Sequence, residues 1–358
     1  MLSTLFSRRR GAVALRLAIL CTLLATVFSV PHSASARAVG KMGPWILGAS
    51  NTLVGNGWRE EMICSIKAEA KVSGVVKQVL VNDVNGNAAD QITGMRTLIS
   101  SGANAIVVDP ADHTSLTNVI QQAHQHGVVV VSVDQLVSSP LAYQAENDQV
   151  AYGRVGMEWL AKQLHGHGNV VILRGIAGAA ADTDRETGIK QALQEYPGIH
   201  VIPGGEQYTG WQPATASSVM LTLLNAHKNI DGVWTSGTDY TVVQAFLTAH
   251  RKLVPVVGAD NNGFIHQVIS LHAQGFVGAA VTNPATIGAV GASLAIQVLE
   301  GKKVAKLTKL TPVVWDYAHN LSDLKANYFP DRPVTYSARV TISPYTHYTP
   351  QQLFACKG

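Results

Sequence analysis

Val128-Val-Val-Val-Ser-Val-Asp134 is a short, nearly continuous β-branched run that ends in an aspartate. Such runs are typical of parallel strands that are covered on both faces. A helical pattern from Asp112 to His126 precedes it. In the second half, Val254-Pro-Val-Val-Gly-Ala-Asp260 follows a predicted helix in the same way. The sequence therefore predicts two copies of one doubly wound, Rossmann-like α/β unit, each built on a parallel sheet.

The same alternation extends outward in both directions. The first half predicts strands at 45–50, 75–82 and 105–109 and helices at 58–70 and 88–100. The second half predicts helices at 149–164, 185–195, 214–226 and 240–250, with strands at 169–173, 200–203 and 232–236. Three crossings near 145–147, 282–284 and 313–316 would join two lobes as a three-segment hinge. The predicted lobes are residues 39–145 plus 284–312, and residues 146–283 plus 313–358 with an irregular tail from about Asn320.

The N-terminus has the order of parts of a secretory signal. Arg8, Arg9 and Arg10 precede an apolar run over 17–30, and Ala-x-Ala sites follow at 34–36 and 36–38. We expect residues 1–38 to be a signal peptide cleaved near 36–38, which places the mature protein in the periplasm. A retained anchor is the alternative, but the apolar run is short for a membrane span.

Charge and cysteine content narrow the function classes. Residues 1–36 hold four arginines and no acid, so the remaining chain has 27 − 4 = 23 basic residues against 23 acidic ones. Without an excess of positive charge, the mature chain has no overall electrostatic attraction for the phosphates of nucleic acid. Cys64 and Cys356 could form a disulfide after export, or Cys64 could be a small buried residue of a helix, and both alternatives remain open.

Motifs of common enzymes are absent from the sequence. No G-x-G-x-x-G opens a helix, and there is no Walker-type lysine loop and no G-x-S-x-G elbow. The 13 histidines are scattered, and the pairs His124/His126 and His165/His167 have no partnering carboxylate nearby in the sequence. We therefore predict no cofactor, no metal and no catalysis.

Ligands of open parallel sheets bind beyond the carboxyl ends of the strands. Tryptophan rings at such positions can stack on the C–H faces of a sugar, and carboxylate, amide and guanidinium groups can bind adjacent hydroxyls in pairs. The alternatives are purely structural roles: Trp58 could belong to the core, and Asp134 and Asp260 could cap the helices that follow them. The predicted ligand-binding residues are Asn56, Trp58, Arg59, Asp134, Gln135, Arg185, Trp211, Asp239, Asp260 and Asn283.

Four stretches together resemble the periplasmic sugar-binding proteins of ABC transporters, of the ribose-binding and galactofuranose-binding type. They are Asn56-Gly-Trp-Arg59, Ser132-Val-Asp-Gln135, Gly175-Ile-Ala-Gly178 continuing through Asp184-Arg-Glu-Thr-Gly188, and Val257-Gly-Ala-Asp260. The resemblance covers nearly the whole mature chain, although Gln135 stands where an arginine is usual. The tail beyond about Asn320 has no counterpart in the shorter members.

The resemblance implies the type I periplasmic binding protein fold and a function. Such a protein captures a small carbohydrate or polyol between two closing lobes and delivers it to an inner-membrane ABC permease with its ATPase. It implies a monomer. The alternative is a periplasmic sensing module that presents its ligand to a chemoreceptor or a sensor kinase.

Overall fold

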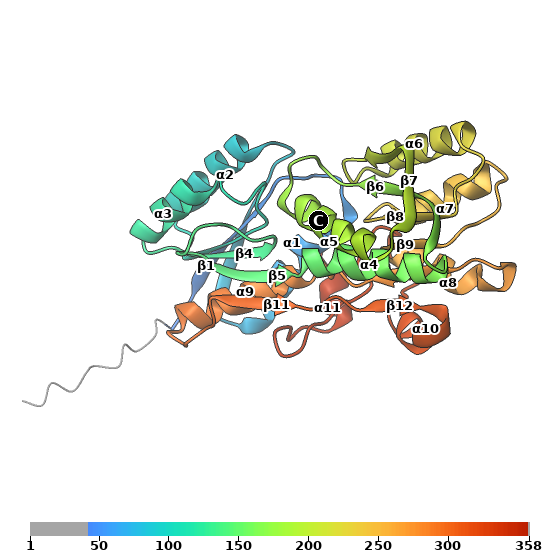
Figure 1. Cartoon of the computed structure of the whole chain (residues 1–358). Helices are drawn as coiled ribbons and strands as arrows, with labels where there is room; N and C mark the ends of the chain where they lie inside the picture. Colours follow the sequence, from blue (N-terminus) through green and yellow to red (C-terminus); the bar gives the residue numbers. More distant parts are fainter. Residues whose placement is uncertain (1–41, 357–358) are drawn as a thin grey trace, which may run out of the picture. The chain divides into compact units, whose positions relative to one another are not determined.

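The computed structural model describes residues 42–356, so the predicted signal peptide lies outside the described residues. The described part contains two six-stranded sheets, with strand orders β11-β5-β4-β3-β1-β2 and β12-β10-β9-β8-β6-β7. Helices cover both faces of each sheet (Figure 1). The predicted fold class of two doubly wound α/β units is therefore confirmed.

The first lobe is built on a fully parallel sheet. Its apolar strand residues pack on one face against α1 and α9, and on the other against α2 and α3. Its strands are β1 (Trp45–Asn51), β2 (Val76–Asp83), β3 (Ala105–Val108), β4 (Val129–Asp134), β5 (Tyr143–Asn147) and β11 (Leu307–Leu310). Its helices are α1 (Gly57–Ser73), α2 (Ala88–Ser100), α3 (Thr117–Gln125) and α9 (Ile287–Leu299).

The second lobe repeats this arrangement, except that its edge strand β12 runs antiparallel to β10. Helices α4 and α5 pack on one face, and α6, α7 and α8 pack on the other. Its strands are β6 (His167–Arg174), β7 (Gly198–Tyr208), β8 (Gly232–Thr235), β9 (Val256–Ala259), β10 (Gly278–Val281) and β12 (Val314–Asp316). Its helices are α4 (Gln149–Gln163), α5 (Ala180–Glu195), α6 (Pro213–Ala226), α7 (Asp239–Thr248) and α8 (Asn262–Ser270), with a short 3₁₀ helix at His272–Gln274.

The chain passes between the two sheets three times, from β5 to α4, from β10 to α9 and from β11 to β12. These crossings place the carboxyl ends of β1, β4, β9 and β10 beside the same gap between the lobes. The polar residues that follow these strands therefore meet there, as expected for open parallel sheets.

Two helices begin five residues away from their predicted starts. Helix α3 begins at Thr117 and not at Asp112, because the Asp112 carboxylate accepts hydrogen bonds from the backbone N–H groups of Thr114 and Ser115 and forms a local turn instead. Helix α5 begins five residues earlier than predicted, at Ala180. Arg185 therefore lies in its second turn and not at its start.

The C-terminal tail contains two helices, α10 (Tyr317–Ala326) and α11 (Pro350–Phe354), separated by a stretch largely without regular structure. Cys356 forms a disulfide with Cys64 of α1, which decides between the two alternatives for the cysteines. Tyr348 and Leu353 pack beside this disulfide, against α1 and α9. The end of the tail is thus fixed on the first lobe.

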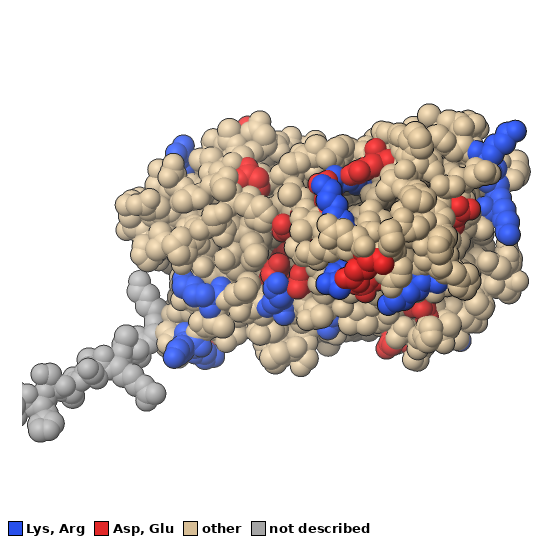
Figure 2. Space-filling model, viewed as in Figure 1, with Lys and Arg blue, Asp and Glu red and all other residues tan. Residues whose placement is uncertain are grey.

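The face of the protein in Figure 2 is mostly uncharged, and its basic and acidic side chains are interspersed. Within residues 42–356, no helix is both long and apolar enough to cross a membrane. The core of each lobe is instead made of buried Val, Ile, Leu and aromatic side chains of the sheet and of its covering helices.

Candidate functional site: a polar cavity between the lobes

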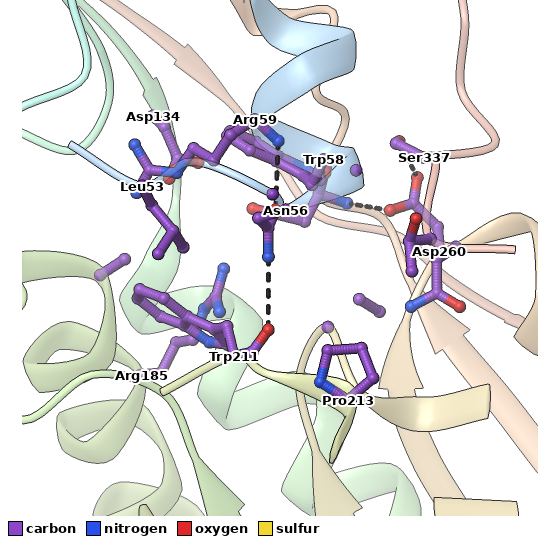
Figure 3. A pocket seen from close by; sticks show the side chains of 18 residues that line it. Leu53, Asn56, Trp58, Arg59, Asp134, Arg185, Trp211, Pro213, Asp260 and Ser337 are labelled. Carbon is purple, nitrogen blue, oxygen red and sulfur yellow. Dashed lines mark hydrogen bonds between the residues drawn. The ribbon is translucent and has the colours of Figure 1, made fainter. Parts of the chain in front are cut away.

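A cavity that is partly open to solvent lies between the two lobes, and it encloses about 700 Å³ when the open space at its mouth is included. Small-molecule ligands bind preferentially in concave sites of this kind. Eight of the ten predicted site residues line it (Figure 3). They are Asn56, Trp58, Arg59, Asp134, Arg185, Trp211, Asp260 and Asn283. Their role in ligand binding stays a prediction.

The start of α1 supplies three of these residues. The Asn56 side chain caps the helix by accepting a hydrogen bond from the Arg59 amide, and its Nδ2 donates across the gap to the Trp211 carbonyl at 3.4 Å. The Trp58 indole donates to the Asn283 carbonyl at 2.7 Å, which fixes the ring plane. Arg59 is buried against Asp109, with which it forms an ion pair. These contacts fix the positions of all three side chains at the start of α1.

Asp134 is the last residue of β4 and has a φ of 64°, in the left-handed region that costs energy for residues other than glycine. Its Oδ1 accepts hydrogen bonds from Asn147 Nδ2 at 2.8 Å and from Gln149 Nε2 at 2.7 Å. None of the hydrogen bonds of the described residues reaches Oδ2 of this side chain, so that oxygen is available to a ligand.

Gln149 connects the site residues at the hinge, and sequence reasoning missed it. Its Nε2 donates to Asp134 and to Asn283 Oδ1, and its Oε1 accepts from Arg185 Nε at 2.8 Å. The residue is fully buried. In the sequence, Gln149 is simply the first residue of a predicted helix, and no motif marks it. Its role depends on Asp134, Asn283 and Arg185, which come close to it only in the folded protein.

Trp211 forms the wall that the second lobe contributes. It lies in the loop between β7 and α6 with a φ of 54° and donates weakly to Ser236 Oγ at 3.4 Å. A Cβ on Gly175 would lie 2.0 Å from the indole, so the ring fits only because residue 175 is glycine. Strained backbone of this kind is concentrated at ligand sites. The guanidinium of Arg185 lies 5.8 Å from the Trp211 ring centroid.

Asp260 and Asn283 form the far end of the cavity. Asp260 Oδ1 accepts from the Asn283 amide at 2.9 Å, and Oδ2 accepts from Ser337 Oγ at 3.3 Å. Burial raises the pKa of Asp260 from 3.8 to about 6, although the hydrogen bond from Asn283 opposes this shift. Burial also raises the pKa of Asp134, against the attraction of Arg185 and Arg59.

Gln135 and Asp239 do not line the cavity, although both were predicted to contact ligand. The Gln135 side chain donates to Asp109 Oδ1 and to the Pro110 carbonyl, and its Oε1 accepts from the Ala181 amide of the second lobe. Asp239 accepts from the Ala259 amide and from Asn261. Both side chains are buried and engaged with the protein, so the structure gives them positioning contacts.

The cavity also has walls that the sequence did not indicate. In the loop after β1 the sequence pointed to Asn56 but not to Leu53 or Gly55, and the tail carried no pattern that pointed to the cavity. The lining residues missed from sequence are Leu53, Gly55, Gly57, Ala181, Pro213, Gly237, Ala259, Asn261, Thr335 and Ser337.

The charges in the cavity wall balance, with two guanidinium groups and two carboxyl groups. Such a wall suits a neutral ligand with many hydroxyls, because each charged group can bind hydroxyls without an unpaired ionic partner. In the part of the chain that the structure describes, no group of three or more His, Cys, Asp or Glu side chains could hold a metal ion.

Two α/β lobes, three crossings and a polar cavity between them define a two-lobed solute-binding protein. The family model described as a periplasmic binding protein domain matches residues 47–303. The chain therefore belongs to the periplasmic binding protein family, and the predicted resemblance is confirmed.

Relatives and solved structures agree with this family. The chain is 29% identical to the xylitol-binding protein of Mycolicibacterium smegmatis. The aligned part is 63% of this chain and 65% of that protein. It is 26% identical to the ribose import binding protein of Escherichia coli, over 63% of this chain and 76% of that protein. An ABC transporter solute-binding protein from Thermobispora bispora has a similar structure, with a TM-score of 0.73, 26% identity and coverage of 82% of this chain and 90% of that chain.

Proposed function

We propose that this protein captures a small neutral sugar or polyol between its lobes and delivers it to an ABC importer, without catalysing a reaction. The observation that carries the proposal is the cavity wall, in which two indole rings face polar side chains contributed by both lobes (Figure 3). The relatives named above bind ribose or xylitol according to their names, which supports a polyhydroxylated ligand.

The proposed mechanism is closure of the lobes about the three crossings. A ligand that touches both lobes stabilises the closed arrangement, because only there are both sets of contacts made. Asn56 with Trp211, and Gln135 with Ala181, already join the lobes by hydrogen bonds. The proposed lobe boundaries are those given from the sequence, although the end of the tail, which they assign to the second lobe, is attached to the first lobe by the disulfide. Residues 1–38 would be removed as the protein is exported to the periplasm.

The proposed partners are an inner-membrane permease and its ATPase, which would dock on the closed, monomeric protein. Family membership supports this assignment. Its test is transport: reconstituted permease should take up the ligand only when the binding protein is present. Uptake that is independent of the binding protein would contradict it.

The first expected result concerns ligand identity. A thermal-shift screen of residues 39–358 against ribose, arabinose, galactose, xylitol, glycerol and myo-inositol should give a clear rise in Tm with at least one of them. A ligand at a hundredfold excess over its Kd adds about 2.7 kcal/mol to the free energy of unfolding. No rise with any of these compounds would contradict the proposed ligand class.

The second expected result concerns pH. Ligand hydroxyls donate to the ionised form of Asp260, whose pKa is about 6 in the ligand-free protein. Binding therefore competes with protonation, and affinity should increase as pH rises from 5 to 7 and then level off. Isothermal titration calorimetry at several pH values measures this. The Asp260→Asn variant should bind more weakly at pH 7 and lose much of the pH dependence, whereas an unchanged profile would contradict the contact.

A further inference from the structure

The tail first runs along the second lobe, beside the loop that follows β9. The amide of Asn262 donates to the Tyr336 carbonyl at 2.8 Å, and the amide of Gly263 donates to the Val334 carbonyl at 2.9 Å. The Ala338 amide donates to the Asp260 carbonyl at 2.7 Å. Residues 334–338, which form turns and one isolated β-bridge, therefore lie directly beside Asp260, one of the cavity residues.

The same segment also contacts the first lobe. Glu61 is a fully buried residue of α1, and its Oε2 accepts a hydrogen bond from the Ser337 amide at 2.6 Å. Thr286, which precedes α9, donates its hydroxyl to the Arg339 carbonyl at 2.8 Å. The tail is thus a fourth connection between the lobes, in addition to the three chain crossings.

Two hydroxyl side chains of this segment, Thr335 and Ser337, line the cavity. Ser337 is 3% exposed, and its Oγ lies 3.3 Å from Asp260 Oδ2 (Figure 3). Thr335 lies against α1 so closely that a Cβ on Gly57 would be 2.0 Å from its Oγ1. The first turn of α1 therefore accepts the tail only because residue 57 is glycine.

The far end of the tail is covalently fixed. The Cys64–Cys356 disulfide joins it to α1, and Tyr348 and Leu353 bury apolar surface beside the disulfide. His347 adds a hydrogen bond from its amide to Glu69 Oε2 at 2.8 Å. These contacts hold the tail on α1, which is also the helix that carries Trp58 and Arg59.

We propose that Thr335 and Ser337 contact the ligand and help to select it, and that the Cys64–Cys356 disulfide holds them against the cavity. The proposal rests on the proposed function and adds the tail to the site. A hydroxyl both donates and accepts, so each can pair with one ligand hydroxyl. A ligand that lacks the matching hydroxyl would leave a buried polar group unpaired, and this discriminates between sugars that differ at one position.

The test uses the chain 39–358 and the variants Ser337→Ala and Thr335→Val. Calorimetric titrations with ribose, arabinose, galactose, xylitol, glycerol and myo-inositol measure Kd for each protein. Each variant should bind the preferred compound roughly 3- to 10-fold more weakly, the loss expected for one hydrogen bond. The ratio of Kd values between the preferred compound and the others should also change. Thr341→Val, at an exposed position of the same tail, should retain wild-type values.

The outcomes separate the two proposals. Wild-type Kd values in both variants would overturn the contacts of Thr335 and Ser337 while leaving the proposed function intact. A wild-type protein that binds none of the six compounds would overturn the proposed function, and the ligand contacts with it.

The holding role of the disulfide has a readout that needs no ligand. In a Cys64→Ser, Cys356→Ser double variant, the amides of Asn262, Gly263 and Ser337 should exchange with deuterium about 10-fold faster or more, because their partners are in the tail or depend on its position. Amides of β3 and β8 serve as internal controls. Equal protection of the three amides in both proteins would overturn the holding role.

Discussion

Asp134→Ala is expected to weaken ligand binding by roughly 10- to 150-fold, the effect of losing about 1.5–3 kcal/mol in hydrogen bonds to a charged group. The variant loses the carboxylate oxygen that is available to the ligand. It also removes an acceptor from the side-chain amides of Asn147 and Gln149. Because Gln149 also holds Arg185 and Asn283, the loss extends to both lobes.

Titration calorimetry on the wild type and the variant measures this effect with the compound that the thermal-shift screen identifies. Asp134→Asn separates charge from shape, because it keeps the volume of the side chain and one oxygen acceptor. It should fall between the wild type and Asp134→Ala. Asp323→Ala, at an exposed acidic position of α10, is the matched control and should bind normally. A Kd within about twofold of wild type in a folded Asp134→Ala protein would contradict the site assignment.

Removing the disulfide is expected to have the largest effect on stability. Cys64 and Cys356 are 292 positions apart, so the disulfide closes almost the whole described chain into one loop. In the chain-entropy account, a loop this long stabilises the folded state by up to about 5 kcal/mol, because the unfolded chain loses freedom. The Cys64→Ser, Cys356→Ser variant should therefore unfold at markedly lower denaturant concentration.

Guanidinium unfolding followed by tryptophan fluorescence measures the change in midpoint. Cys64 is 3% exposed in an apolar cluster, so a serine hydroxyl there adds a burial cost, and a Cys64→Ala, Cys356→Ala variant separates that cost from the loss of the cross-link. Ala355→Ser, at the exposed neighbouring position, keeps the disulfide and should unfold like the wild type. A loss of less than about 1 kcal/mol in the alanine variant would contradict a structural role for the disulfide.

Local patterns in the sequence were sufficient for the sheets and for most of the cavity wall. The Val-rich runs before Asp109, Asp134 and Asp260 form buried parallel strands, and α2 has its predicted bounds of Ala88–Ser100. Residues that follow such strands converge whatever the details of packing, because parallel strands end at one edge of a sheet. This is why eight of the ten predicted residues line one cavity.

Which way each polar side chain turns depended on its neighbours in space. Gln135 and Asp239 lie at strand ends just as Asp134 and Asp260 do, yet their side chains turn into the protein and do not line the cavity. Gln149 shows the converse, since only its neighbours Asp134, Asn283 and Arg185 make it central.

Only the tertiary structure decided the course of the tail. Ser337 meets Glu61 over 276 positions of sequence, and Cys356 meets Cys64 over 292. Helical and strand periodicity reflects burial against neighbouring elements and is visible in a short window of sequence. A segment without periodicity is positioned by hydrogen bonds to distant backbone and by apolar contacts that form only after both lobes have folded. The pairing of the cysteines and the place of Thr335 and Ser337 in the cavity wall follow from that packing.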